Sequence, residues 1–114
     1  MKKLIAVLIC LTLLLTGCGK EETKERTIDS IIKENNYIIV DVRALDEYNT
    51  GHVKGAINIP YDTINANTKL DKDKTIVVYC KSGKRSKIAY DKLKELGYDV
   101  FDLGAYDTIK LEKE

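Results

Sequence analysis

The sequence predicts an α/β domain whose small, mostly parallel sheet carries helices on both faces. Two short segments, residues 37–42 (YIIVDV) and 75–79 (TIVVY), are almost continuously apolar and rich in β-branched residues, which is typical of strands buried on both faces. Segments with apolar residues at helical spacing alternate with these strands. Such alternation favours parallel strands joined by helices. Ligands of these sheets bind beyond the carboxyl ends of the strands.

The first half of the domain contains a helix, a strand, a second helix and a second strand. Thr27 can cap a short helix with isoleucines at helical spacing, and the strand 37–42 follows it. A short helix is expected over 44–49. Two glycines then predict a turn, and we expect a strand over 56–59 that ends at Pro60, because proline cannot donate to a strand ladder.

The second half continues the alternation around the strand 75–79. A weak helix is expected over 61–66, before this strand. After the strand and its loop, a longer helix has an apolar face and ends near Gly97, a typical C-terminal cap. That face consists of Ile88, Ala89, Leu93 and Leu96. A last strand over 98–103 and a short helix over 105–112 complete the prediction.

The N-terminus has the pattern of a bacterial export signal. Lys2 and Lys3 precede an apolar run over 4–15, which is shorter than the roughly 20 residues that span a bilayer. Residues 15–18 (LTGC) resemble a lipobox, whose cysteine receives a diacylglycerol group before cleavage. The resemblance implies a signal peptide over 1–17 and an extracytoplasmic lipoprotein anchored to a membrane through lipid-modified Cys18. An ordinary secretory signal or an uncleaved anchor is the alternative.

The remaining chain consists of a charged tether and one domain. Residues 18–27 lack large apolar side chains, and nine such residues reach roughly 30 Å when extended. The domain is expected over 28–114. Residues 1–18 hold two lysines and no acid, so the rest carries 17 Lys and Arg against 18 Asp and Glu, a net charge of −1. This balance argues against a nucleic-acid partner.

Cys80 is expected to be the only free thiol of the mature protein. Of the three cysteines, Cys10 would leave with the signal peptide and Cys18 would carry lipid. The chain has no C-x-x-C motif, so a thioredoxin-type redox pair is excluded. Cys80 is then either a buried, inert residue or a reactive one.

The segment that follows Cys80, CKSGKRS (80–86), can stabilise an anion. Gly83 permits a left-handed turn in which successive N–H groups point inward, and a helix that begins near Ser86 adds the positive end of its dipole. Four cations add positive potential: Lys81, Lys84, Arg85 and Lys87. These effects predict a Cys80 pKa well below that of a free cysteine. The alternative is a cysteine packed as a small hydrophobic residue beside solvated lysines.

Two motifs resemble those of the rhodanese-like sulfurtransferases. The first lies in residues 38–61 (IIVDVRALDEYNTGHVKGAINIPY), and its matching parts are Asp41-Val42-Arg43, Glu47-Tyr48, Gly51-His52-Val53, Gly55-Ala56 and Asn58-Ile59-Pro60. The second, VVYCKSGKRS (77–86), resembles the active-site loop C-x-x-G-x-R-S of that family. The resemblance covers about residues 28–110 and implies the rhodanese-like fold.

The resemblance also implies sulfur transfer through a persulfide. The Cys80 thiolate would attack a small sulfur-containing anion such as thiosulfate, and Arg85 would fix the loop or the anionic donor. A thiol, cyanide or a protein would accept the sulfur. No cofactor or metal is expected. The backbone N–H groups that would cradle the persulfide belong to Lys81, Ser82, Gly83, Lys84, Arg85 and Ser86.

Other functions of the same fold remain open. Related phosphatases and arsenate reductases use C-x5-R, whereas Arg85 is the fifth residue after Cys80, the C-x4-R spacing of the sulfurtransferases. A sulfur carrier or redox-sensing module that does not turn over is a second possibility. A third is an inactive scaffold that uses the fold for binding.

Several residues outside the loop are expected to support it. Asp41 and Arg43 should form an ion pair or hydrogen-bond network, with Glu47 as a possible partner, and His52 should satisfy backbone groups of its turn. Tyr48, Tyr61 and Tyr106 are expected either to line the entrance or to pack. The family pattern Gly-Gly-x-x-x-Trp is replaced near the C-terminus by Gly104-Ala105 and Ile109, which puts the local packing in question.

Overall fold

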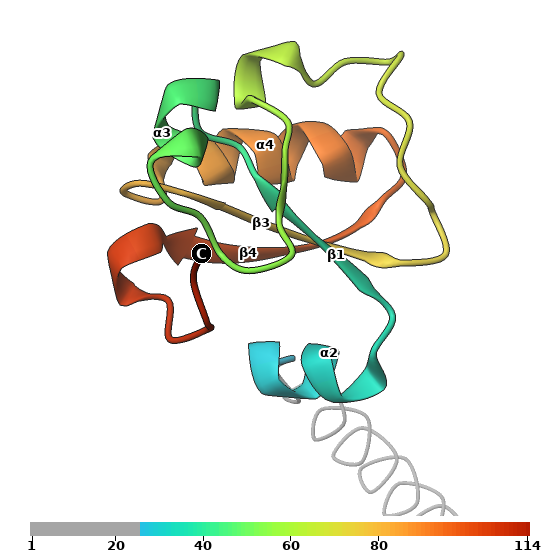
Figure 1. The fold of residues 1–114 in the computed structure, drawn as a ribbon. Coiled ribbons are helices and arrows are strands. Elements are labelled where there is room, and N and C mark those ends of the chain that lie inside the picture. Colours follow the sequence, from blue (N-terminus) through green and yellow to red (C-terminus); the bar gives the residue numbers. More distant parts are fainter. Residues whose placement is uncertain (1–25) are drawn as a thin grey trace, which may run out of the picture.

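The computed structural model describes residues 26–114 and shows a four-stranded, fully parallel sheet of order β2-β1-β3-β4 (Figure 1). The predicted α/β class is therefore confirmed. In chain order the elements are α2 (Ile28–Glu34), β1 (Tyr37–Asp41), α3 (Leu45–Asn49), β2 (Ile57–Asn58), η1 (Tyr61–Thr63), β3 (Thr75–Cys80), α4 (Lys84–Glu95), β4 (Asp99–Ala105) and η2 (Tyr106–Thr108).

The predicted signal peptide (1–17), the lipid-modified Cys18 and most of the tether lie outside the described residues. Among residues 26–114, no helix has the length and apolar character needed to cross a membrane. The described part begins beside the sheet, where Arg26 forms an ion pair of 2.8 Å with Asp99 and α2 follows with Thr27 as its cap.

The alternating side chains of β3 divide the core into two layers. Ile76, Val78 and Cys80 point into the layer under α4, and Val77 and Tyr79 point into the other. All five side chains are completely buried. In Figure 1, α4 and η1 lie over one face of the sheet, and α2 and the C-terminal segment lie over the other. The predicted arrangement of helices on both faces is confirmed.

The C-terminal segment differs from the prediction. Strand β4 runs to Ala105 and only the 3-10 turn η2 follows, so the predicted helix over 105–112 is wrong. Ile109 is extended and buried in the second core layer, where it takes the place expected of the family's aromatic residue. Residues 112–114 then bond to residues 52–54, with backbone N···O distances of 2.8–2.9 Å. If residues 105–112 formed a helix, Ile109 could not be buried in this layer while residues 112–114 pair with residues 52–54.

Two other elements are shorter or shifted. The weak helix expected over 61–66 is only the turn η1, because Ile64 is extended and buried beneath α4. Helix α4 begins at Lys84, two residues before the predicted start near Ser86.

Gly104 gives β4 an irregularity opposite the end of β3. The register passes from Val78–Asp102 to Tyr79–Gly104, so one residue of β4 is skipped. Gly104 has φ of +90°, and its backbone lies about 3.9 Å from the position that a Cβ on Gly83 would occupy. The retained glycine of the family pattern thus lies against the loop that follows Cys80.

We predict that Gly104→Ala lowers the free energy of unfolding by about 1–2 kcal/mol, because a side chain disfavours this left-handed conformation. No atom lies within 4 Å of the added Cβ, so the loss would be conformational rather than steric. Urea unfolding followed by circular dichroism measures it. Gly104→Asn is the matched control and should lose less, since asparagine tolerates positive φ. Equal losses in the two variants would contradict this explanation.

Candidate active site

Cys80 is the last residue of β3, and its sulfur lies at the N-terminus of α4. The residue is completely buried, and Sγ accepts hydrogen bonds from the backbone N–H groups of Gly83, at 3.0 Å, and Ser86, at 3.2 Å. Gly83 has φ of +95° and is the residue that caps α4, as the sequence predicted for a left-handed turn. The Ser86 hydroxyl donates to the Gly83 carbonyl at 3.1 Å and ties the loop to the first helical turn.

These hydrogen bonds favour the thiolate form of Cys80. Burial raises the pKa of the thiol, but hydrogen bonds donated by Ser86 and Gly83 outweigh this effect, and the net pKa is lowered. The unpaired N–H groups of a helix N-terminus stabilise an anion in the same way. The arrangement therefore holds a reactive sulfur anion in a buried position.

The lysines of the loop are not among the largest influences on the pKa of Cys80. Lys81 and Lys84 are exposed, and the amine of Lys87 pairs with Asp91 at 2.8 Å. The largest influences on the pKa of Cys80 are burial and hydrogen bonds, and no lysine is among them. Substrate contacts of Lys81, Ser82 and Lys84 remain predictions.

Arg85 is held by Glu47 of α3. The two guanidinium nitrogens donate to the two carboxylate oxygens at 2.7 and 2.9 Å. Hydrogen bonds from Arg85 lower the pKa of the Glu47 carboxyl to about 2, so the pair stays ionised at neutral pH. Glu47, named above as a possible partner of Asp41 and Arg43, makes its side-chain ion pair with Arg85, and the charge of Arg43 contributes less to lowering its pKa. Arg85 thus fixes the loop, and its positive charge is already paired with the Glu47 carboxylate.

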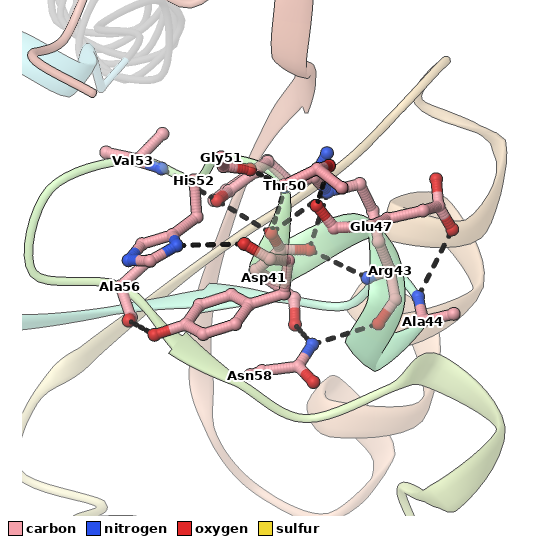
Figure 2. Close-up of polar contacts among 12 residues, drawn as sticks. Asp41, Arg43, Ala44, Glu47, Thr50, Gly51, His52, Val53, Ala56 and Asn58 are labelled. Atoms are coloured by element: carbon pink, nitrogen blue, oxygen red, sulfur yellow. Dashed lines mark hydrogen bonds and ion pairs between the residues drawn. The ribbon is translucent and has the colours of Figure 1, made fainter. Parts of the chain in front are cut away.

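Asp41 and Arg43 form a buried ion pair at the carboxyl end of β1 (Figure 2). Nη2 of Arg43 lies 2.6 Å from Oδ2 of Asp41 and donates to the Gly51 carbonyl at 2.7 Å. Burial alone would lower the pKa of Arg43, but its interactions with Asp41 raise it. The side-chain amide of Asn58 donates to the carbonyls of Asp41, at 3.0 Å, and Arg43, at 2.9 Å. The network joins β1 to β2 and to the turn that follows α3.

Tyr79, which precedes Cys80 in β3, extends this network within the other core layer. Its hydroxyl donates to Asp41 at 2.8 Å and accepts from the N–H of Val53 at 3.0 Å. Burial raises the pKa of this hydroxyl, so it keeps its proton and can donate a hydrogen bond. Arg43 also lies over the ring of Tyr106, 4.4 Å from its centroid. The roles of Tyr79 and Asn58 were not predicted, because neither a tyrosine in a buried strand nor an asparagine in the short strand β2 carries a local signal of such a network.

His52 lies in the turn after α3, away from the sulfur. Its Nδ1 is 3.0 Å from the carbonyl oxygen of Tyr48, and its Nε2 is 3.2 Å from a carboxylate oxygen of Glu114. The ring stacks on Tyr48, with centroids 3.9 Å apart. Tyr48 donates to the Ala56 carbonyl and Tyr106 stacks on Tyr79, so both tyrosines pack within the fold. These contacts match the structural role expected for His52.

Comparison with known proteins agrees with this site. The model of the rhodanese-like domain family matches residues 25–110. The thiosulfate sulfurtransferase PspE of Escherichia coli (strain K12) is 42% identical over 78 residues, which cover 65% of this chain and 75% of that protein. The thiosulfate sulfurtransferase GlpE of Coxiella burnetii (strain RSA 331) is 31% identical over 83 residues, 70% of this chain and 78% of that protein.

The solved structure of a rhodanese with anions from E. coli has a TM-score of 0.62 and 34% sequence identity, and covers 68% of this chain and 96% of its own. The chain belongs to the rhodanese-like domain family. Within that family it is a rhodanese-type sulfurtransferase.

We predict that Cys80 in the folded protein is alkylated with a pH midpoint below the ~8.5 of a free cysteine, because its thiolate is hydrogen-bonded. Only the thiolate reacts, so a lower pKa moves the rise in rate to lower pH. The rate of iodoacetamide labelling is measured on the Cys80 peptide by mass spectrometry. Labelling in urea is the control and should show the ordinary midpoint. A folded midpoint at or above the unfolded one would contradict the prediction.

Proposed function

We propose that this protein moves sulfane sulfur from an anionic donor such as thiosulfate to a thiophilic acceptor through a persulfide on Cys80. The observation that carries the proposal is the pair of backbone N–H groups, of Gly83 and Ser86, that donate to Sγ. They stabilise the attacking thiolate. In the persulfide the negative charge moves to the outer sulfur, which further backbone N–H groups of residues 81–86 would stabilise. The sulfurtransferases PspE and GlpE, similar over most of this domain, support the same chemistry.

In the first half-reaction, the Cys80 thiolate attacks the outer sulfur of thiosulfate. A sulfur–sulfur bond forms to Sγ, the bond between the two sulfurs of thiosulfate breaks, and its electron pair leaves on sulfite. No proton is transferred, so no general base is needed. This agrees with the position of His52, whose ring nitrogens face Tyr48 and Glu114. The enzyme is left with an anionic persulfide in the loop.

In the second half-reaction, the acceptor attacks the outer persulfide sulfur. Its nucleophile forms a new bond to that sulfur, the bond to Sγ breaks, and Cys80 is regenerated as a thiolate. Cyanide, a thiol or a protein thiol can serve as the acceptor. Arg85, held by Glu47, keeps the loop in one conformation through both halves. Four residues lie between Cys80 and Arg85, whereas five lie between the cysteine and the arginine in the C-x5-R loop of related phosphatases.

We predict that thiosulfate adds one sulfur, ~32 Da, to the chain and that cyanide removes it, because Cys80 forms a persulfide. Intact-mass spectrometry before and after each reagent measures the change. Cys80→Ser should gain nothing, and Arg85→Ala should load more slowly because its loop loses the bond to Glu47. Steady-state turnover with excess cyanide distinguishes an enzyme from a carrier that loads once. An adduct that persists in Cys80→Ser would contradict the assignment.

We further propose that the protein is an extracytoplasmic bacterial lipoprotein, anchored to the membrane through Cys18. The apolar run over 4–15 and the lipobox-like residues 15–18 support this location. The described chain enters the domain beside Asp99, the first residue of β4, whereas Cys80 lies at the carboxyl end of the same sheet. The chain that leads to the anchor therefore enters at the edge of the sheet opposite the active site.

Labelling of cells with a fatty-acid analogue tests the anchor. The full chain should incorporate the label, and Cys18→Ala should lose it because no other residue would receive the lipid. Cys10→Ala is the matched control and should retain the label. Equal labelling of the Cys18→Ala protein would contradict lipidation at this residue, whatever the activity of Cys80.

A further inference from the structure

Asp102 lies in β4 at a position where the fold favours an apolar residue, and the reaction described above gives it no role. Val100 belongs to the core layer under α4, whereas Phe101 and Leu103 pack against the other layer. Because side chains alternate along a strand, Asp102 faces α4, where it is half-buried. Aspartate is disfavoured within strands, so a carboxylate at this position calls for a specific partner.

The partner of this carboxylate is the backbone of β4 itself. Its Oδ1 accepts a hydrogen bond from the N–H of Gly104 at 3.0 Å, which closes a turn around Leu103. Leu103 is the residue that the pairing of β4 with β3 skips. The hydrogen bond of Asp102 therefore spans the irregularity and stabilises the strand in this bulged form.

The skipped residue decides which part of β4 lies beside the cysteine. Regular pairing after Asp102 would place Gly104 opposite Cys80, but the observed register places Ala105 there. Gly104 lies against Gly83 instead. Its Cα and its carbonyl carbon are 3.9 and 4.0 Å from the position that a Cβ on Gly83 would occupy. The bulge thus brings the backbone of β4 into contact with the active-site loop.

Gly83 is held from two sides. On the side of α4, its carbonyl accepts from the Ser86 hydroxyl at 3.1 Å and from the N–H of Lys87 at 3.2 Å. On the side of β4, it contacts the backbone of Gly104. Its own N–H donates to Sγ of Cys80 at 3.0 Å. A shift of Gly104 would release one side of Gly83 and distort this hydrogen bond, which weakens steeply as its angle departs from linearity.

We propose that Asp102 is a positioning residue for sulfur transfer, because the bulge that it stabilises holds Gly83 where its N–H donates to the Cys80 thiolate. The inference rests on the proposed function as far as it concerns the transfer of sulfur. The negative charge of Asp102 acts in the opposite direction, since a nearby anion disfavours a thiolate. The hydrogen bond and the charge therefore predict opposite shifts when Asp102 is replaced.

Two uncharged variants of the full chain separate the hydrogen bond from the charge. Asp102→Asn keeps an oxygen that can accept from Gly104, whereas Asp102→Ala does not. Asp102→Ala should raise the pH midpoint of iodoacetamide labelling at Cys80 by about 0.5–1 unit relative to Asp102→Asn, as expected when a hydrogen bond to the thiolate is weakened. Asp102→Asn should keep a midpoint equal to or below that of the unaltered protein, because it loses only the charge.

The rate of sulfur loading from thiosulfate gives a second readout. At a pH below both midpoints, Asp102→Ala should load sulfur about two- to fivefold more slowly than Asp102→Asn. A smaller fraction of its Cys80 is thiolate, and the higher nucleophilicity of that thiolate compensates only in part. Intact-mass spectrometry at timed intervals after addition of thiosulfate measures the rate.

Thr75→Val controls for a general loss of stability in β4. The Thr75 hydroxyl donates to Asp99 at 2.9 Å, so this variant loses a hydrogen bond to the opposite end of the same strand. Urea unfolding should show a lower free energy of unfolding for Thr75→Val and for Asp102→Ala. Only Asp102→Ala should move the labelling midpoint of Cys80.

The outcomes separate this inference from the proposed function. Equal midpoints in Asp102→Ala and Asp102→Asn would overturn the inference, because the hydrogen bond would then have no effect on the sulfur. A rise of the same size in Thr75→Val would also overturn it, since lower stability alone would explain the shift. If thiosulfate does not load Cys80 in the unaltered protein, the proposed function fails, whereas the labelling midpoints still test the role of Asp102.

Discussion

The site depends on the hydrogen bonds that the start of α4 donates to the Cys80 sulfur. Strand β3 delivers the residue to the carboxyl edge of a parallel sheet, and the positive φ of Gly83 turns the chain at once into the helix. The N–H groups of Gly83 and Ser86 then have the sulfur as their acceptor. Because these donors are backbone groups, their position follows from the fold and needs no additional side chain.

Two ion pairs fix the surroundings of this helix start. Glu47 and Arg85 join α3 to α4 on the outside, partly exposed to solvent. Asp41 and Arg43 are buried, and their charges are stabilised by their ion pair and by further hydrogen bonds. The backbone N–H of Arg43 donates to Asp41, and the guanidinium of Arg43 donates to the Gly51 carbonyl. Removal of Asp41 or of Arg43 would leave the other residue as a buried unpaired charge, which is strongly destabilising. The buried pair supports the strand ends, whereas the outer pair holds the loop itself.

The sequence predicts the part of the site that lies on one continuous segment. Cys80 at a strand end, a left-handed Gly83 and a following helix are local features with strong patterns. The pairing of Glu47 with Arg85 was not predicted, because it depends on how α3 is oriented over the sheet edge. The C-terminal helix was wrong for a similar reason, since pairing of residues 112–114 with residues 52–54 is a long-range contact that overrides local propensity.

The central claim is that Cys80 receives the outer sulfur of thiosulfate. Thiosulfate labelled with sulfur-34 only at its outer atom tests it most directly, by mass spectrometry of the Cys80 peptide and of the released sulfite. Attack on the outer sulfur predicts a gain of about 34 Da on the Cys80 peptide and unlabelled sulfite. Label in the released sulfite, or on a peptide without Cys80, would contradict the mechanism.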